Sequence, residues 1–183
     1  ILRLGTPEEQ IVTIGPDRLA ALSARIDSLN HTDGLLGVVI TGPSAHMFAA
    51  GADIQRIGES TDPEQGRQAA ALGRSTFAKL RDLPIPVVAA IGGPCLGGGL
   101  ELALFCDVRV AADHKATKIG LPEVKLGIVP GFGGSQELPR LIGIPKALDL
   151  ILKGSALPAK AARSKGVVDR VVPPELLLEA AIE

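Results

Sequence analysis

The segment PCLGGGLELAL, residues 94–104, is the stretch from which the fold and the chemistry of this chain are best inferred. Three consecutive glycines, Gly97 to Gly99, precede a run of helical character. Glycines at a switch from strand to helix let the backbone approach a ligand closely, and the first N–H groups of the helix have no acceptor within it. Such N–H groups can hold a phosphate or a developing oxyanion.

The residues around these glycines favour an oxyanion over a phosphate. No G-x-G-x-x-G occurs, and no glycine run is followed by Lys-Ser or Lys-Thr, so the sequence has neither a dinucleotide fingerprint nor a P-loop. Glu101 lies three residues after Gly98, where the helix dipole favours a carboxylate. A surface charge at the start of a helix is the alternative interpretation, but the apolar residues on both sides of Glu101 leave little room for a solvated face.

A second carboxylate, Glu123, stands in the glycine-rich segment IGLPEVKLGIVPGFGG, residues 119–134. Twenty-two residues separate it from Glu101, which is enough chain to leave and return through two short strands. The two acids could therefore converge on one pocket. In a partly dry site their pKa values can be pushed apart, so that one acts as an acid and the other as a base. An exposed charge in a turn is the alternative for Glu123.

The third element is FAAGAD, residues 48–53. Ala49 to Ala52 have almost no side-chain bulk, so a backbone N–H in this loop could be offered to a ligand. Such a donor would complete an oxyanion hole of two N–H groups. A tight turn in which Asp53 caps the next helix is the alternative, and we expect Asp53 to serve as that cap in either case.

Composition excludes several classes of function. The chain has 183 residues with a net charge of −1, which gives no electrostatic reason to bind nucleic acid or an anionic membrane. No apolar run approaches the roughly 18 residues of a membrane span. Cys95 and Cys106 are too few for a disulfide framework, and we interpret them as buried free thiols of a cytosolic protein. His31, His46 and His114 are scattered, so no metal-ligand spacing occurs.

Strands and helices are predicted to alternate along the whole chain. We expect strands at 11–14, 35–41, 86–91, 108–112, 117–120 and 167–172. We expect helices from Pro16 through Leu29, after the glycine run, and at 69–82, 134–142, 145–153, 158–165 and 174–182. Residues 58–70 are polar and are predicted to form a mobile loop. This order indicates an α/β domain whose largely parallel strands are buried on both faces.

Three segments resemble the crotonase superfamily of enoyl-CoA hydratases and isomerases, in its order and at about its spacing. They are FAAGADI (48–54), GGPCLGGGLELALFCDVRVAAD (92–113) and IGLPEVKLGIVPGFGGSQELPRLIG (119–143), within a similarity that spans residues 35–172. The resemblance implies a crotonase-like (ClpP/crotonase) spiral of ββα units with largely parallel sheets. GLPEVKLGIVPGFGG most resembles the hydratase domain of multifunctional fatty-acid β-oxidation proteins, in which a 3-hydroxyacyl-CoA dehydrogenase domain follows on the same chain.

The resemblance also assigns roles to individual positions. Ala52 and Gly98 match the two backbone donors of the family's oxyanion hole, and Glu101 and Glu123 match the paired glutamates of true hydratases. Further positions are expected to contact the substrate: Ala50, Asp53, Ile54, Gly97, Pro122 and Gly131.

The function implied by the resemblance is reversible hydration of 2-enoyl-CoA to 3-hydroxyacyl-CoA in fatty-acid β-oxidation. The alternatives are a Δ3-Δ2 enoyl-CoA isomerase and a non-catalytic CoA-binding or assembly domain. The acyl-CoA thioester is the expected partner, and no metal or separate cofactor is expected because coenzyme A is part of the substrate. Residues 1–183 are expected to form one domain that lacks the family's C-terminal helices. A cytoplasmic location is expected, with either a homo-oligomer (trimer or hexamer) or a β-oxidation complex with a thiolase.

Overall fold

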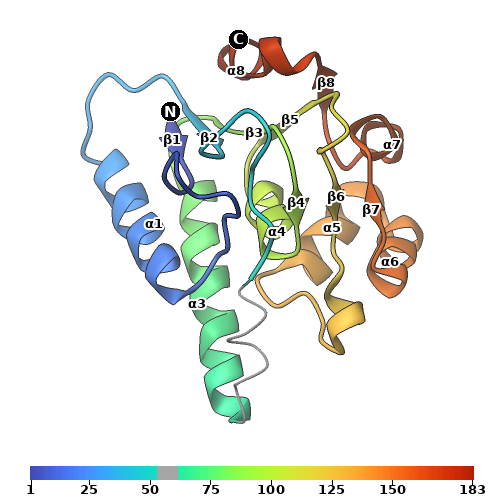
Figure 1. The fold of residues 1–183 in the computed structure, drawn as a ribbon. Helices are drawn as coiled ribbons and strands as arrows, with labels where there is room; N and C mark the ends of the chain where they lie inside the picture. The colour runs from blue at the N-terminus through green and yellow to red at the C-terminus, as the bar shows by residue number, and fades with distance from the viewer. Residues whose placement is uncertain (53–61) are drawn as a thin grey trace.

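The computed structural model describes residues 1–52 and 62–183 and contains two β-sheets (Figure 1). The larger sheet has five strands, all parallel, in the order β1-β2-β3-β5-β8. These strands are β1 (Leu2–Arg3), β2 (Val38–Thr41), β3 (Val87–Ile91), β5 (Val108–Ala112) and β8 (Arg170–Val172). The smaller sheet has the order β4-β6-β7 and consists of β4 (Cys95–Leu96), β6 (Ile119–Gly120) and β7 (Ala156–Leu157).

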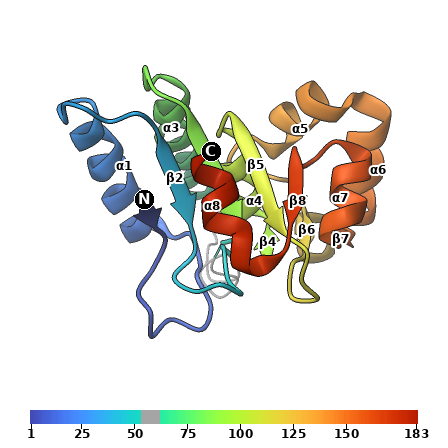
Figure 2. The same cartoon turned by 90° about the horizontal axis from the view of Figure 1, so that it is seen from above.

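Helices occupy most of the chain between the strands, which confirms the predicted α/β class. They are α1 (Pro16–Leu29), α3 (Pro63–Arg81), α4 (Gly98–Leu104), α5 (Gly134–Ile142), α6 (Ile144–Lys153), α7 (Ala159–Lys165) and α8 (Leu177–Ile182). Two short 3₁₀ turns, η1 (Glu123–Leu126) and η2 (Pro174–Leu176), complete the described elements. Figures 1 and 2 both show α1 and α3 side by side, and Figure 2 shows α8 across the larger sheet.

The larger sheet is buried on both faces because small and branched apolar residues occupy consecutive positions of its strands. Since successive side chains of a strand point to opposite faces, each strand contributes to two cores. One face packs against α1, α3 and α4 through Val38, Ile40, Val87, Ala89, Ile91 and Ala111. The other face packs against α8 through Val39, Ala90, Val110, Ala112 and Val172.

The smaller sheet brings two distant segments of the chain to one place. Strands β4 and β6 are parallel, with Cys95 opposite Ile119 and Leu96 opposite Gly120. The chain leaves β4 into α4, and it leaves β6 into η1. Because parallel strands end at the same edge of a sheet, α4 and η1 both begin at this edge.

Two predictions about local structure were wrong. Residues 11–14 are not a strand: they run beside the loop at 49–51 and make only two backbone hydrogen bonds with it, Ile14 N–H to Gly51 O and Ala50 N–H to Val12 O. The loop predicted at 58–70 is wrong for 63–70, which are helical because α3 begins at Pro63 and the carboxylate of Asp62 accepts the N–H of Glu64. Residues 58–61 lie outside the described residues. Proline in the first turn with an aspartate before it is a favourable helix start.

An ion pair with one buried partner joins β5 to the chain entering β8. The side chain of Arg109 is 5% exposed, and its guanidinium lies 2.6 Å from the carboxylate of Asp169. The side chain of Asp169 is 40% exposed. The same carboxylate oxygen accepts the backbone N–H of Arg109 at 2.8 Å. Removing the acid would leave a cation inside the protein without its counter-charge, which is the costly way to break such a pair.

We therefore expect Asp169→Asn to lower the free energy of unfolding by about 1–3 kcal/mol, at the low end for a buried pair because Asp169 is partly solvated. Urea unfolding monitored by circular dichroism would measure the change. Asp149→Asn is the matched control, since Asp149 is also 40% exposed but pairs with Lys153, whose side chain is 68% exposed. Equal losses in the two variants would contradict the importance of the buried arginine.

Candidate active site

Glu101 is held inside the protein by the start of α5. Its side chain is carried on the first turn of α4, and the residue is 2% exposed. One carboxylate oxygen, Oε1, accepts the backbone N–H of Phe132 at 2.7 Å and that of Gly134 at 2.8 Å. These donors belong to a turn and to the first residue of a helix, where N–H groups have no acceptor within the helix. Glu101 therefore satisfies donors that would otherwise be left unpaired.

Glycines allow the close approach that this arrangement needs. Gly97, which precedes α4, has φ = 51°, a conformation that only glycine adopts readily. A Cβ on Gly99 would lie 2.3 Å from the carbonyl oxygen of Ala49, so the first turn of α4 packs directly on the backbone of the 49–52 loop. A Cβ on Gly134 would lie 3.0 Å from Cγ of Glu101. The side chain of Glu101 thus occupies the space that a larger residue at 134 would fill.

Glu123 follows strand β6 and reaches the start of α4. It is the first residue of η1, three positions after Gly120, and it is 7% exposed. Its Oε1 lies 2.9 Å from the position of a Cβ built on Gly97. Its Oε2 is buried and has no hydrogen-bond partner among the described residues. A buried carboxylate oxygen without a partner is a place where a proton or a polar ligand is favoured.

The two carboxyl groups influence each other electrostatically. Burial, the largest cause, and the like charge of Glu123 together raise the pKa of Glu101 to about 7, against the opposing effect of the N–H groups of Gly134, Phe132 and Gly133. Burial also raises the pKa of Glu123 above its usual value. Two acids that repel one another share protons as a pair, so near neutral pH one can hold a proton while the other is ionised.

The two predicted oxyanion donors lie close together. The loop at 49–52 runs parallel to β4, with Ala49 N–H bonded to Pro94 O at 2.9 Å and Leu96 N–H bonded to Ala49 O at 3.0 Å. Gly98 is the first residue of α4, so its N–H has no acceptor within the helix. A Cβ built on Gly98 would lie 3.9 Å from the backbone nitrogen of Ala52. The structure therefore brings Ala52, Gly98 and both glutamates to one end of α4.

The other predicted contact residues are placed as follows. Gly97 lies beside Glu123, and Pro122 directly precedes it. The N–H of Ala50 is bonded to Val12 O, and the carbonyl of Gly131 accepts Nη1 of Arg74 at 2.9 Å. Two further predicted contact residues, Asp53 and Ile54, lie outside the described residues, as does the predicted capping role of Asp53.

An aromatic ring forms one wall of this region. The ring of Phe132 lies 3.1 Å from the position of a Cβ on Gly98 and packs edge-on against Phe77 of α3, with centroids 5.7 Å apart. A Cβ on Gly73 of α3 would lie 2.3 Å from the same ring. The sequence pattern singles out neither Phe132 nor Gly134, although both lie in the glycine-rich segment at 119–134. The sequence around Gly73 does not predict its contact with Phe132, because the two residues are distant in the sequence.

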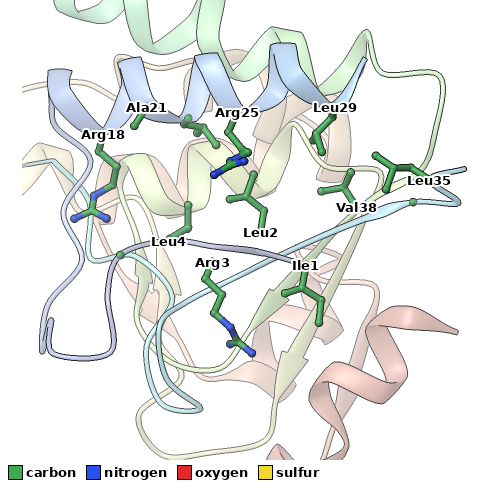
Figure 3. A pocket seen from close by; sticks show the side chains of 13 residues that line it. Ile1, Leu2, Arg3, Leu4, Arg18, Ala21, Arg25, Leu29, Leu35 and Val38 are labelled. Atoms are coloured by element: carbon green, nitrogen blue, oxygen red, sulfur yellow. The ribbon is translucent and has the colours of Figure 1, made fainter. Parts of the chain in front are cut away.

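A separate cavity of about 620 Å³ lies between α1 and β1 (Figure 3). Its lining is mostly aliphatic, with the cationic side chains of Arg3, Arg18 and Arg25 and without a carboxylate. It therefore offers no acid–base pair. Among the described residues, no group of three or more His, Cys, Asp or Glu side chains could hold a metal ion. None of the described helices is long and apolar enough to cross a membrane.

The parallel strands β4 and β6 thus bring two buried glutamates and a glycine-flanked helix end to one place. The sequence model of the enoyl-CoA hydratase/isomerase family matches residues 16–183. The chain belongs to the enoyl-CoA hydratase/isomerase family, within the crotonase superfamily.

Solved structures agree with this assignment. An enoyl-CoA hydratase from Bacillus anthracis is 40% identical and superposes with a TM-score of 0.86, over 93% of this chain and 65% of that one. An enoyl-CoA hydratase from Thermoplasma volcanium GSS1 is 34% identical, with a TM-score of 0.89 over 98% and 70% of the two chains. An enoyl-CoA hydratase/carnithine racemase from Magnetospirillum magneticum is 29% identical, with a TM-score of 0.90 over 98% and 67%. The chain thus spans about two thirds of the length of these proteins.

The burial of Glu101 predicts a stability that depends on pH. Because the folded pKa of about 7 lies above the ordinary value of 4.5, the folded protein binds this proton more tightly than the unfolded chain does. The folded state is thus penalised progressively as pH rises from 4.5 to about 7, by an order of about 3 kcal/mol once Glu101 is fully ionised.

We expect Glu101→Gln to remove this penalty, since its amide oxygen can still accept both N–H groups. The variant should be more stable than the wild type by about 1–3 kcal/mol at about pH 8 and nearly equal to it at about pH 5, as urea unfolding would show. Glu175→Gln, at an exposed position, is the control. A loss of stability at both pH values in Glu101→Gln would contradict this account of the burial.

Proposed function

We propose that this chain catalyses the reversible hydration of 2-enoyl-CoA thioesters to 3-hydroxyacyl-CoA. The observation that carries the proposal is the pairing of two buried, electrostatically coupled carboxyl groups, Glu101 and Glu123, at the end of α4 where Gly98 and Ala52 lie. Coenzyme A enters as part of the substrate, and the mechanism needs no metal or separate cofactor.

The backbone N–H groups of Ala52 and Gly98 would hold the thioester carbonyl oxygen. Negative charge grows on that oxygen as a nucleophile adds to the conjugated double bond, and preorganised donors stabilise it. Gly98 is suited to this role because it begins a helix, where the N–H is free of intrahelical bonds and the dipole favours negative charge.

The two carboxyl groups would handle the protons. Glu101 takes a proton from the water that attacks carbon 3, and Glu123 delivers a proton to carbon 2, so that hydroxyl and hydrogen are added across the double bond. The two amide donors to Oε1 favour the ionised form of Glu101, as a base requires. The buried Oε2 of Glu123, which has no hydrogen-bond partner among the described residues, is available to carry a proton. In dehydration the two roles reverse.

Loss of crotonyl-CoA absorbance on adding the protein would test the reaction. We expect Glu101→Gln and Glu123→Gln each to lower kcat by about 10²–10⁴, the usual contribution of a general acid or base. Glu175→Gln should leave kcat unchanged. If wild-type protein hydrates crotonyl-CoA and both glutamine variants retain its kcat, the assigned roles are wrong.

The oxyanion assignment can be tested at Gly98. A Cβ there lies 3.1 Å from the ring of Phe132 and 3.9 Å from the backbone nitrogen of Ala52, so a valine would crowd the space between the two proposed donors. We expect Gly98→Val to lower kcat by at least about 10², with the circular dichroism spectrum retained. Gly66→Val is the control, because a Cβ on Gly66 of α3 meets nothing within 4 Å. Near wild-type turnover in a folded Gly98→Val variant would remove Gly98 from the site.

Isomerisation of 3-enoyl-CoA to 2-enoyl-CoA is a second candidate activity. It needs one carboxylate as a proton shuttle, and the partnerless Oε2 of Glu123 is available for such a transfer. Conversion of a 3-enoyl-CoA by Glu101→Gln would support this activity. A non-catalytic CoA-binding or assembly domain is the remaining alternative, and it predicts no turnover of either substrate.

For the whole protein we propose a role in fatty-acid β-oxidation. The likeness of residues 120–134 to multifunctional β-oxidation proteins supports a hydratase domain associated with a 3-hydroxyacyl-CoA dehydrogenase activity. We also propose that residues 1–183 act as one domain in the cytoplasm, within a homo-oligomer or a complex with a thiolase.

A further inference from the structure

A buried carboxylate other than the proposed catalytic pair lies at the start of α5. Glu137 is 8% exposed and stands three residues after Gly134. Its two oxygens have separate partners: Oε2 accepts Nη2 of Arg81 at 2.9 Å, and Oε1 accepts Nη1 of Arg140 at 2.7 Å. The two arginines differ in setting, because the side chain of Arg81 is 48% exposed and that of Arg140 is 69% exposed.

Arg81 connects three helices through one guanidinium group. It is the last residue of α3, and its Nη2 also lies 3.4 Å from the carbonyl oxygen of Leu104, the last residue of α4. The guanidinium carbon lies 4.7 Å from the centre of the Phe105 ring, a cation–π contact. Through Glu137 it is joined to the first turn of α5. Arg81 thus ties the helix that carries Glu101 to the helix whose first N–H group holds Glu101.

The connection continues to the carboxylate of Glu101 itself. The N–H of Glu137 is bonded to the carbonyl of Gly133 at 2.9 Å. Gly133 has φ = 122°, and a Cβ there would lie 3.0 Å from the Phe105 ring and 3.8 Å from Cγ of Glu137. The turn that precedes α5 is therefore packed between Phe105 and Glu137. Gly134, the next residue, donates its N–H to Oε1 of Glu101.

We propose that the Arg81–Glu137 pair is a positioning device that fixes the start of α5 against α4 and thereby keeps Oε1 of Glu101 hydrogen-bonded in its reactive orientation. This inference rests on the proposed hydratase function for its consequence on rate. Neither residue touches the reacting atoms, so each acts only through Glu101. A displacement of about 1 Å at a reacting group can cost about 10² in rate, so a pair outside the site can influence turnover.

The experiment compares Arg81→Met and Glu137→Gln with Arg140→Met. The first two variants break the same ion pair from opposite sides, and the third removes the more exposed partner of the same carboxylate. We expect the first two to lower kcat by about tenfold with KM within about twofold, and Arg140→Met to stay near wild type. The double variant Arg81→Met/Glu137→Gln should be no worse than Glu137→Gln alone, because that variant already breaks the Arg81–Glu137 pair. The pair of Glu137 with Arg140, which Glu137→Gln also breaks, is tested separately by Arg140→Met.

A second readout follows the pKa of Glu101 by carbon-13 NMR of labelled carboxyl groups and needs no activity. If the N–H bonds to Oε1 weaken, both variants raise this pKa above its value of about 7. A simple effect of charge gives a different result, because loss of the Arg81 cation raises the pKa whereas loss of the Glu137 anion lowers it. A rise of the Glu101 pKa in Glu137→Gln is therefore expected only if the ion pair positions Glu101.

The possible results separate this proposal from the proposed function. A rise of the Glu101 pKa in both variants, with no hydration by the wild type, supports the positioning role and removes the hydratase. Unchanged kcat and an unchanged Glu101 pKa, together with a lower free energy of unfolding, would overturn the positioning role and leave a purely structural ion pair. A fall of the pKa in Glu137→Gln would likewise overturn it.

Discussion

Two hydrogen bonds, from the N–H groups of Phe132 and Gly134 to one oxygen of Glu101, are the interaction on which the rest of the site depends. Burial alone would drive the carboxyl group towards its neutral form. The two donors oppose this, so its pKa is raised only to about 7. The same bonds satisfy N–H groups at the start of α5. They therefore both stabilise the start of this helix and favour the ionised form of Glu101.

Glycines around this contact let backbone and side chains approach one another closely. Gly99 lets α4 lie on the carbonyl of Ala49, and Gly134 makes room for Glu101 itself. Gly73 on α3 accommodates the ring of Phe132. With only 2% aromatic residues in the chain, such a ring is uncommon here, and it is placed beside the end of α4 rather than deep in the core.

The burial of the two glutamates lowers the stability of the folded protein at neutral pH. Two like charges held in a poorly hydrated place repel each other and lose solvation, and both effects oppose folding at neutral pH. Ion pairs between residues other than Glu101 and Glu123 stabilise the folded protein. Arg109 with Asp169 joins the strands of the larger sheet, and Arg81 with Glu137 joins the helices around Glu101.

Local sequence signals predicted the α/β class and most of the helices, and they singled out Gly98, Glu101 and Glu123 as candidate site residues. These features leave local marks, namely apolar periodicity, glycine runs and a carboxylate among apolar residues. The local signals fail at residues 11–14, where the partner is a loop, and at 63–70, where a polar sequence forms a helix. Only the tertiary structure revealed the amide donors to Glu101, the pairing of Gly73 with Phe132 and the contact of Arg81 with Glu137, 56 residues apart. Such contacts depend on which elements pack together, and no short stretch of sequence carries that information.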